Sequence, residues 1–447
     1  MTTTATPELL QTLIRNRCVN DGSPGSGGES RNADAIASLV EGPGVDVERY
    51  EPVPGRASLV ARIEGTDPNA PSLLLMGHTD VVPATPETWQ RDPFGGELVD
   101  GEVWGRGAVD MLNHTASMAV AVRDLADSGF RPRGSLIYLA VADEEGGGTY
   151  GAEWLLEHQR ESVAADYVIT ETGGMALPMP GSSETLLPVM VGEKGFGWIT
   201  LVVRGTPGHG SMPLRTDNAL VKAAAVVERI AAIQQRSQVD GAWRSFIEEC
   251  RLPEQVERMF LDADALAAYC ASEEADLGLA RLIHATTTTT FAPTMVSGGV
   301  KANVIADRVE ITVDIRTLPG VEAHDVAALI ADAVGAELMA SVELRQDRFH
   351  AASVSATGTP LWDSLSTVTP ALLPGARPVP FLLVGVTDAR FFRDRESIAY
   401  GYGLFSNRIS FRDFAAMFHG NDERIDVESL DLSTRLWSGI ARDFLGA

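Results

Sequence analysis

The first 190 residues alternate between helix-like and strand-like patterns, and this alternation constrains the fold more than any other feature. Four segments carry apolar side chains at helical spacing: residues 9–17, 32–40, 115–128 and 150–159. Four short runs are strand-like and mostly apolar: residues 58–64, 72–76, 135–142 and 167–170. Continuous apolar strands between helices are typical of a largely parallel sheet that is covered on both faces. The sequence therefore predicts an α/β fold with helices on either side of a twisted sheet.

The pattern changes after residue 192. Residues 304–316 alternate between apolar and polar side chains, as expected of a strand with one exposed face. A strand at 198–205 and helices at 218–234 and 321–334 complete a strand-helix-strand-helix layout. This layout suits a small open-faced α/β sandwich of ferredoxin-like type. Because 447 residues exceed one ordinary core, the sequence predicts two domains, the first from residues 1–190 and 351–447 and the inserted one from residues 191–350.

Residues 236–290 are less regular than the rest of the insert. They contain acidic helical pieces and end in a run of threonines at 286–290. Threonine is β-branched and favours strands, so we expect residues 286–290 to form a short strand. The segment makes the insert longer than a minimal domain of this type.

Composition narrows the possible partners and the compartment. The net charge is −25 and the pI about 4.7, which argues against nucleic acid or an anionic membrane as a partner. Three scattered cysteines are too few for a disulfide framework or a cysteine-rich zinc site. The N-terminus has neither a basic start nor an apolar stretch, and no run approaches the roughly 18 apolar residues of a membrane span. We therefore expect a cytoplasmic protein.

Acidic and imidazole side chains gather at the ends of the predicted strands. His78, Glu144, Glu145 and Glu171 each lie just past a predicted strand. In open α/β sheets, ligands bind outside the carboxyl ends of the strands, so one fold brings these residues together. Asp110 lies in a glycine-rich turn and His419 far downstream. The set supplies ligands for two divalent ions and leaves one carboxylate over as a base.

These residue types favour particular metals. Histidine and carboxylate ligands without thiolates suit Zn²⁺, with Co²⁺ or Mn²⁺ as substitutes. Asp110 is the candidate for a shared ligand that holds two ions roughly 3.5–4 Å apart. Asp80 could accept the second imidazole N–H of His78. A lone loop histidine or a solvated Glu144-Glu145 pair is the simpler interpretation of each motif alone, but the ordered set favours a metal site.

The motifs resemble those of the co-catalytic zinc hydrolases, which include aminoacylase, glutamate carboxypeptidase, carnosinase-type dipeptidases and succinyl-diaminopimelate desuccinylase. The matching stretches are Gly77-His78-Thr79-Asp80, Gly105-Arg106-Gly107 with Asp110, Asp143-Glu144-Glu145, and His419-Gly420 with Glu423. The resemblance implies that His78, Asp110 and Glu171 hold one zinc. Asp110, Glu145 and His419 would hold the other zinc. Glu144 would be the general base, and Asp80 the partner of His78. The Asp110–Met111 peptide would be cis.

The resemblance also implies residues that bind the substrate. His209 would reach across a homodimer formed by the inserted domain, residues 191–350, which would act as a lid, and would stabilise the oxyanion. Asn303 and Arg316 match positions that hold the substrate, and Arg316 suits an α-carboxylate. Arg390 follows a turn similar to the family's Gly-Gly-Thr-Asp segment. His114 is a tempting further ligand, but its position favours the start of a helix.

The expected reaction is hydrolysis of small N-acyl amino acids or dipeptides that carry a free carboxylate. N-carbamoyl or succinyl amides remain an alternative, as does a non-catalytic metal-binding scaffold. The long 236–290 segment and Thr172-Gly173-Gly174 after Glu171 resemble the yeast vacuolar carboxypeptidase branch. An enlarged lid could also complete the site within one chain instead of forming a dimer.

Overall fold

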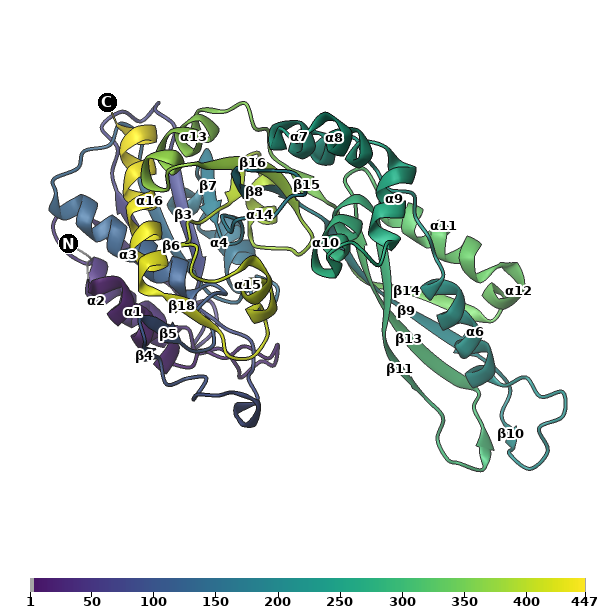
Figure 1. Cartoon of the computed structure of the whole chain (residues 1–447). Helices are drawn as coiled ribbons and strands as arrows, with labels where there is room; N and C mark the ends of the chain where they lie inside the picture. The colour runs from purple at the N-terminus through teal and green to yellow at the C-terminus, as the bar shows by residue number, and fades with distance from the viewer. Residues whose placement is uncertain (1–3, 447) are drawn as a thin grey trace.

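The computed structural model describes residues 4–446 and has two lobes (Figure 1). The larger lobe is built on a nine-stranded sheet in the order β1-β2-β6-β3-β7-β17-β8-β15, with β16 beside β8. Its strands are β1 (Asp46–Tyr50), β2 (Ser58–Ile63), β3 (Leu73–His78), β6 (Leu136–Val141), β7 (Tyr167–Thr170), β8 (Thr185–Glu193), β15 (Ser353–Val354), β16 (Ala376–Leu383) and β17 (Ile398–Gly401). The central pairs β6-β3, β3-β7 and β7-β17 are parallel. The predicted mostly parallel sheet is confirmed.

Helices cover both faces of this sheet. One face carries α1 (Ala5–Arg15), α2 (Ser30–Val40), α3 (Leu112–Asp127), α13 (Pro360–Leu372) and α16 (Val427–Leu445). The other carries α4 (Ala152–His158), α5 (Arg160–Val163) and α14 (Ala389–Arg393). The sequence of β3 is continuously apolar because both faces of the strand are buried. Leu73 and Leu75 pack on the first face, and Leu74 and Met76 pack on the second.

The smaller lobe is an antiparallel sheet in the order β11-β13-β9-β14, with helices on one face. Its strands are β9 (Gly195–Arg204), β11 (Thr290–Gly298), β13 (Arg308–Thr317) and β14 (Val342–His350), and its helices are α6 (Ala219–Ala231), α11 (Ala323–Val334) and α12 (Ala336–Met339). Val309, Ile311, Val313 and Ile315 are buried, as the alternation predicts. The chain first enters this lobe after Lys194 and leaves it for the last time after His350.

The predicted strand at 304–316 is interrupted in the structure. β12 (Val304–Ile305) pairs with β10 (Gly208–His209), and β13 begins only at Arg308. Two carbonyl groups at the break bond outside the strand. The Ala306 carbonyl accepts the Ala219 N–H at the start of α6, and the Asp307 carbonyl accepts the Gly205 N–H. Together β10 and β12 form a tip at the far end of the smaller lobe (Figure 1).

Residues 236–290, which lack a regular pattern in the sequence, form four helices that pack on the larger sheet. They are α7 (Gly241–Cys250), α8 (Glu254–Phe260), α9 (Ala263–Ala271) and α10 (Leu277–Thr287). Phe246 of α7 packs edge-on against Phe381 of β16, with ring centroids 4.8 Å apart. The buried Lys194 donates hydrogen bonds to the Ala285 and Thr288 carbonyls at the end of α10, both at 2.7 Å. These helices therefore cover the β8–β16 edge and not the smaller sheet.

The prediction of a strand at 286–290 is wrong. Thr286 and Thr287 end α10, and β11 begins at Thr290. Their hydroxyl groups donate to the carbonyls of Leu282 and Ile283 one turn earlier, each at 2.8 Å. These bonds allow β-branched residues to close a helix. No helix within residues 4–446 is both long and apolar enough to cross a membrane.

Candidate metal centre and substrate cavity

Two groups of possible metal ligands lie side by side at the carboxyl ends of the parallel strands. His78, Asp110 and Glu171 form one group, and Asp110, Glu145 and His419 form the other. Asp110 belongs to both, because its Oδ1 lies 3.3 Å from His78 Nε2 and its Oδ2 lies 3.2 Å from His419 Nε2. His419 Nε2 is 3.3 Å from Glu145 Oε2. The sequence-predicted ligands thus converge on two adjacent positions around one shared carboxylate.

Strand geometry explains this convergence. His78 ends β3, Glu171 directly follows β7, and Glu145 lies four residues beyond β6. Asp110 lies in the turn before α3, and its peptide bond to Met111 is cis, as predicted. His419 follows α15 (Phe411–Met417) and adopts a left-handed backbone conformation with φ 53°. That conformation turns the chain after α15 toward Asp110 and Glu145.

The second nitrogen of His78 has a different acceptor from the predicted one. His78 Nδ1 lies 2.9 Å from the backbone carbonyl of Asp80, whereas the Asp80 carboxylate is 3.6 Å away. Either acceptor fixes the imidazole tautomer so that Nε2 faces the site. The Asp80 carboxylate instead accepts the backbone N–H groups of Glu144 and Glu145 at 3.3 and 3.1 Å. Asp80 therefore positions the turn that carries both glutamates.

A buried hydrogen-bond network supports the turn that carries Glu144 and Glu145. Asn20 donates to Asp80 at 2.8 Å and to Asp143 at 3.1 Å. Arg56 donates to Asp143 at 3.0 Å and to Glu29 at 2.8 Å. The network links the loop before α2 to the ends of β3 and β6. No sequence motif points to Asn20 or Arg56.

The Asp110 turn rests on Glu423. One oxygen of this carboxylate accepts the N–H groups of Val109 and Asp110 at 2.7 and 2.9 Å. The other accepts those of Gly107 and the Arg106 guanidinium, both at 2.9 Å. Glu423 lies four residues after His419. It therefore couples the positions of the shared ligand and the distant histidine.

The charges of the site fit divalent cations. Within residues 4–446, only the two histidines form ion pairs with Asp110, Glu145 and Glu171. Burial raises the pKa of Glu171 well above its usual range, and the nearby carboxylates raise it further. One buried oxygen of Glu145 has no hydrogen-bond partner among the described residues. When ionised, the three ligand carboxylates and Glu144 carry four negative charges, which two divalent cations would balance.

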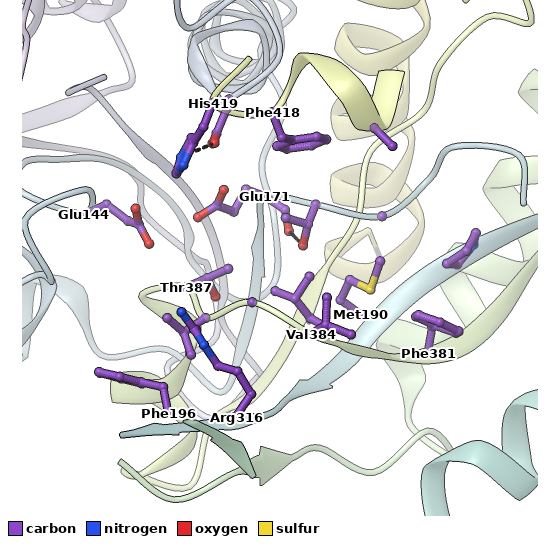
Figure 2. A pocket seen from close by; sticks show the side chains of 18 of the residues that line it. Glu144, Glu171, Met190, Phe196, Arg316, Phe381, Val384, Thr387, Phe418 and His419 are labelled. Atoms are coloured by element: carbon purple, nitrogen blue, oxygen red, sulfur yellow. Dashed lines mark hydrogen bonds and ion pairs between the residues drawn. The ribbon is translucent and has the colours of Figure 1, made fainter. Parts of the chain in front are cut away.

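Glu144 lies beside both ligand groups and belongs to neither. Its side chain lines the cavity next to the metal centre, with Glu171 and His419 opposite (Figure 2). Burial raises the pKa of Glu144 well above its usual range, with a further increase from Glu171. Bound cations would lower this pKa again. A carboxylate in this position could exchange a proton with a group held by cations at the two ligand groups.

The cavity has a volume of about 640 Å³ and a cationic side opposite the glutamates. The guanidinium groups of Arg316, Arg348 and Arg390 lie 5.3–5.9 Å from the ring centroid of Phe196. Asp314 accepts two hydrogen bonds from Arg316 and fixes its orientation. Arg390 is buried and donates to the carbonyls of Thr387 and Gly147. Arg348 lies in the polar part of β14, and no sequence motif marks it as a cavity residue.

Two predicted residues lie far from this cavity within one chain. His209 and Asn303 are exposed at the tip formed by β10 and β12, and neither lines the cavity. Figure 1 shows that tip at the end of the smaller lobe that is farthest from the larger sheet. His114 lies in the first turn of α3, buried between Phe405 and Trp437, as the helix-start interpretation predicts.

The comparisons with known proteins assign the class. The chain is a metal-dependent hydrolase of the type that acts on peptide and amide bonds. The family model described as Peptidase family M20/M25/M40 matches residues 74–443, most of the sequence, and the chain belongs to this family.

Three similar proteins illustrate the range of this family. The chain is 28% identical over 389 residues to an N-fatty-acyl-amino acid synthase/hydrolase of Xenopus tropicalis, covering 86% of this chain and 74% of that protein. It is 27% identical to a succinyl-diaminopimelate desuccinylase of Cereibacter sphaeroides, covering 92% and 93%. An M20 family metallo-carboxypeptidase from Sulfolobus solfataricus has a similar fold, with a TM-score of 0.73, 17% identity and 99% of both chains covered.

Proposed function

We propose that the protein hydrolyses the amide bond of N-acyl amino acids or dipeptides with a free carboxylate, using two zinc ions. The observation that carries this proposal is the pair of ligand groups around Asp110, with Glu144 left free beside them. Relatives named as an N-fatty-acyl-amino acid synthase/hydrolase and a desuccinylase support an N-acyl amide as substrate.

The residues of the cavity have different roles in the proposed reaction. When bound, the two cations acidify a water molecule and polarise the scissile carbonyl. Glu144 takes the proton of the attacking water and passes it to the departing amine. Arg316, oriented by Asp314, binds the substrate carboxylate through charge-assisted hydrogen bonds. Burial of the site strengthens each of these interactions.

Glu144→Gln tests the assignment directly. The amide keeps the shape of the side chain but removes the base, so we expect turnover to fall by about a thousandfold while metal content is unchanged. Hydrolysis of N-acetyl amino acids and dipeptides by zinc-reconstituted protein, with elemental analysis of both proteins, measures the two quantities. Full activity in the variant would refute the role of Glu144. Glu153→Gln on α4 serves as the control.

The exposed tip supports a second part of the proposal, a homodimer in which His209 completes the site of the partner subunit. Large apolar side chains are exposed in and near the tip: Met212, Leu214, Met295, Val296 and Val300. β11 is an edge strand whose outer side pairs with no strand among the described residues. Apolar exposure along such an edge is typical of a protein interface.

Mixing two inactive variants tests action across the dimer. His209→Ala and Glu144→Gln subunits are each inactive alone if the site needs both residues. A mixed dimer contains one site with its own Glu144 and the partner's intact His209. Random subunit exchange should therefore restore about a quarter of the wild-type activity. Absence of any recovery, with mixed dimers demonstrated by native mass spectrometry, would show that His209 does not act across the dimer.

A further inference from the structure

One side of the cavity is lined by apolar side chains. Beyond the metal centre it continues between six residues, which we call the apolar arm: Leu177, Met190, Leu282, Phe381, Val384 and Phe414. In Figure 2, Met190, Val384 and Phe381 lie beyond Glu171, on the side away from Glu144. Phe381 and Leu177 are buried, and Leu282 and Met190 are half-buried.

The charged residues of the cavity are confined to its other sides. They are the metal ligands with Glu144, and the arginines around Phe196. A substrate can therefore form polar contacts at the metal centre and at the arginines, whereas the arm offers only apolar contacts. A ligand group that fills the arm must itself be apolar, because an unpaired polar group there would lose its hydration without compensation.

The arm depends on the helices that the irregular segment forms. Leu282 lies on α10, which stays near the larger sheet because Lys194 holds its last carbonyls. Phe381 of β16 lies at the boundary between the arm and the apolar core under α7, where it contacts Phe246. Of these four helices, α10 alone contributes a side chain to the cavity lining, and that side chain, Leu282, belongs to the arm and not to the candidate metal centre.

We propose that the apolar arm binds the acyl group of the substrate, so that the preferred substrates are N-acyl amino acids whose acyl group is an extended apolar chain. This inference rests on the proposed amide hydrolysis. With the carboxylate at Arg316 and the scissile carbonyl at the metals, the amino acid lies on the Phe196 side. The acyl group then extends past Glu171 toward Met190 and Phe381, which lie on that side of the cavity in Figure 2.

Two substrate series test the assignment. In the first, glycine carries an acetyl, octanoyl or dodecanoyl group; in the second, the acetyl group is fixed and the amino acid is glycine, leucine or phenylalanine. A buried methylene can raise kcat/KM by up to about fourfold, so we expect octanoyl to exceed acetyl by at least about fiftyfold. A flat first series would overturn the proposal, as would an increase found only in the second series.

A filled arm should abolish the preference. Leu282→Trp places a larger side chain in the arm, and we expect the octanoyl-to-acetyl ratio of kcat/KM to fall by at least about tenfold. Arg281→Trp adds the same side chain to the exposed neighbouring position on α10 and should leave the ratio unchanged. An unchanged ratio in a folded Leu282→Trp protein would place the acyl chain elsewhere.

Calorimetry separates failure of this inference from failure of the proposed function. Octanoylglycine should bind the zinc-loaded Glu144→Gln protein more tightly than acetylglycine, with a more negative heat-capacity change from apolar burial. Hydrolysis of all chains at equal rates, with equal binding, would refute the arm and leave the amidase proposal standing. Chain-dependent binding without hydrolysis of any amide by the wild-type protein would support the arm and refute the amidase proposal.

Discussion

The metal centre and the tip formed by β10 and β12 differ in how completely a single chain builds them. His78, Asp110 and Glu171 are at most 8% exposed, and each is held by a strand end or a buried network. His209 and Asn303 are exposed on a two-stranded ribbon with few supporting contacts. Parallel strands bring their carboxyl ends together whatever else binds, so the fold assembles the ligands. A single chain leaves the tip exposed, so a comparable environment there would require contact with a second molecule.

Removing the shared ligand Asp110 from the metal centre should reduce activity more than any other substitution. In Asp110→Ala both candidate metal positions lose a ligand, and we expect both ions to be lost and hydrolysis to fall below detection. Elemental analysis and turnover measure the outcome, with the exposed Asp46→Ala as control. Retention of one tightly bound ion would show that the two positions do not depend equally on Asp110.

Removing the tip histidine should have a smaller but large effect. We expect His209→Ala to lower kcat by about a hundredfold to a thousandfold, the range for loss of one oxyanion donor, without changing metal content. His324→Ala, at an exposed position on α11, is the matched control. Wild-type kcat in His209→Ala would remove the tip from catalysis and leave the metal centre as the whole site.

The same contrast explains how much the sequence could predict. The central strands β3, β6 and β7 are short, apolar and almost entirely buried, so their ends, and with them His78 and Glu171, could be located by pattern alone. The shared position of Asp110 followed from the resemblance and from the chemistry of carboxylates. The side on which α7–α10 pack could not be inferred, because their apolar faces would suit either sheet. That choice is fixed by contacts such as Phe246 with Phe381, which are 135 positions apart.

Single supporting residues were also beyond sequence reasoning. Asn20 lies in a loop with no periodic signal, and its partners Asp80 and Asp143 are 60 and 123 positions away. Arg348 belongs to a strand whose polar residues all resemble surface residues in sequence. The carbonyl of Asp80 accepts from His78, whereas its carboxylate accepts the two backbone N–H groups and the Asn20 amide. Such choices depend on three-dimensional competition for hydrogen bonds.

Removing a residue that supports the metal centre from behind should lower its affinity for metal. In Asn20→Ala, Asp80 and Asp143 lose a shared donor, so the turn that carries Glu144 and Glu145 is less well fixed. We expect zinc affinity to fall by about tenfold to a hundredfold, as for other groups behind metal ligands. Competition with a chelator measures the affinity, and the exposed Asn69→Ala is the control. Unchanged affinity would mean that the backbone alone holds the turn.

Arg316 joins the two regions, because it lies on a strand of the smaller sheet but its side chain lines the cavity. Arg316→Lys keeps the charge and loses the two-pronged geometry, so we expect KM to rise by about tenfold while kcat changes little. Steady-state kinetics with an N-acyl amino acid separates the two parameters, and Arg308→Lys at the start of the same strand is the control. A lower kcat at constant KM would place Arg316 in the transition state instead. Unchanged kinetics would assign the carboxylate to Arg348, whose guanidinium also lies beside Phe196.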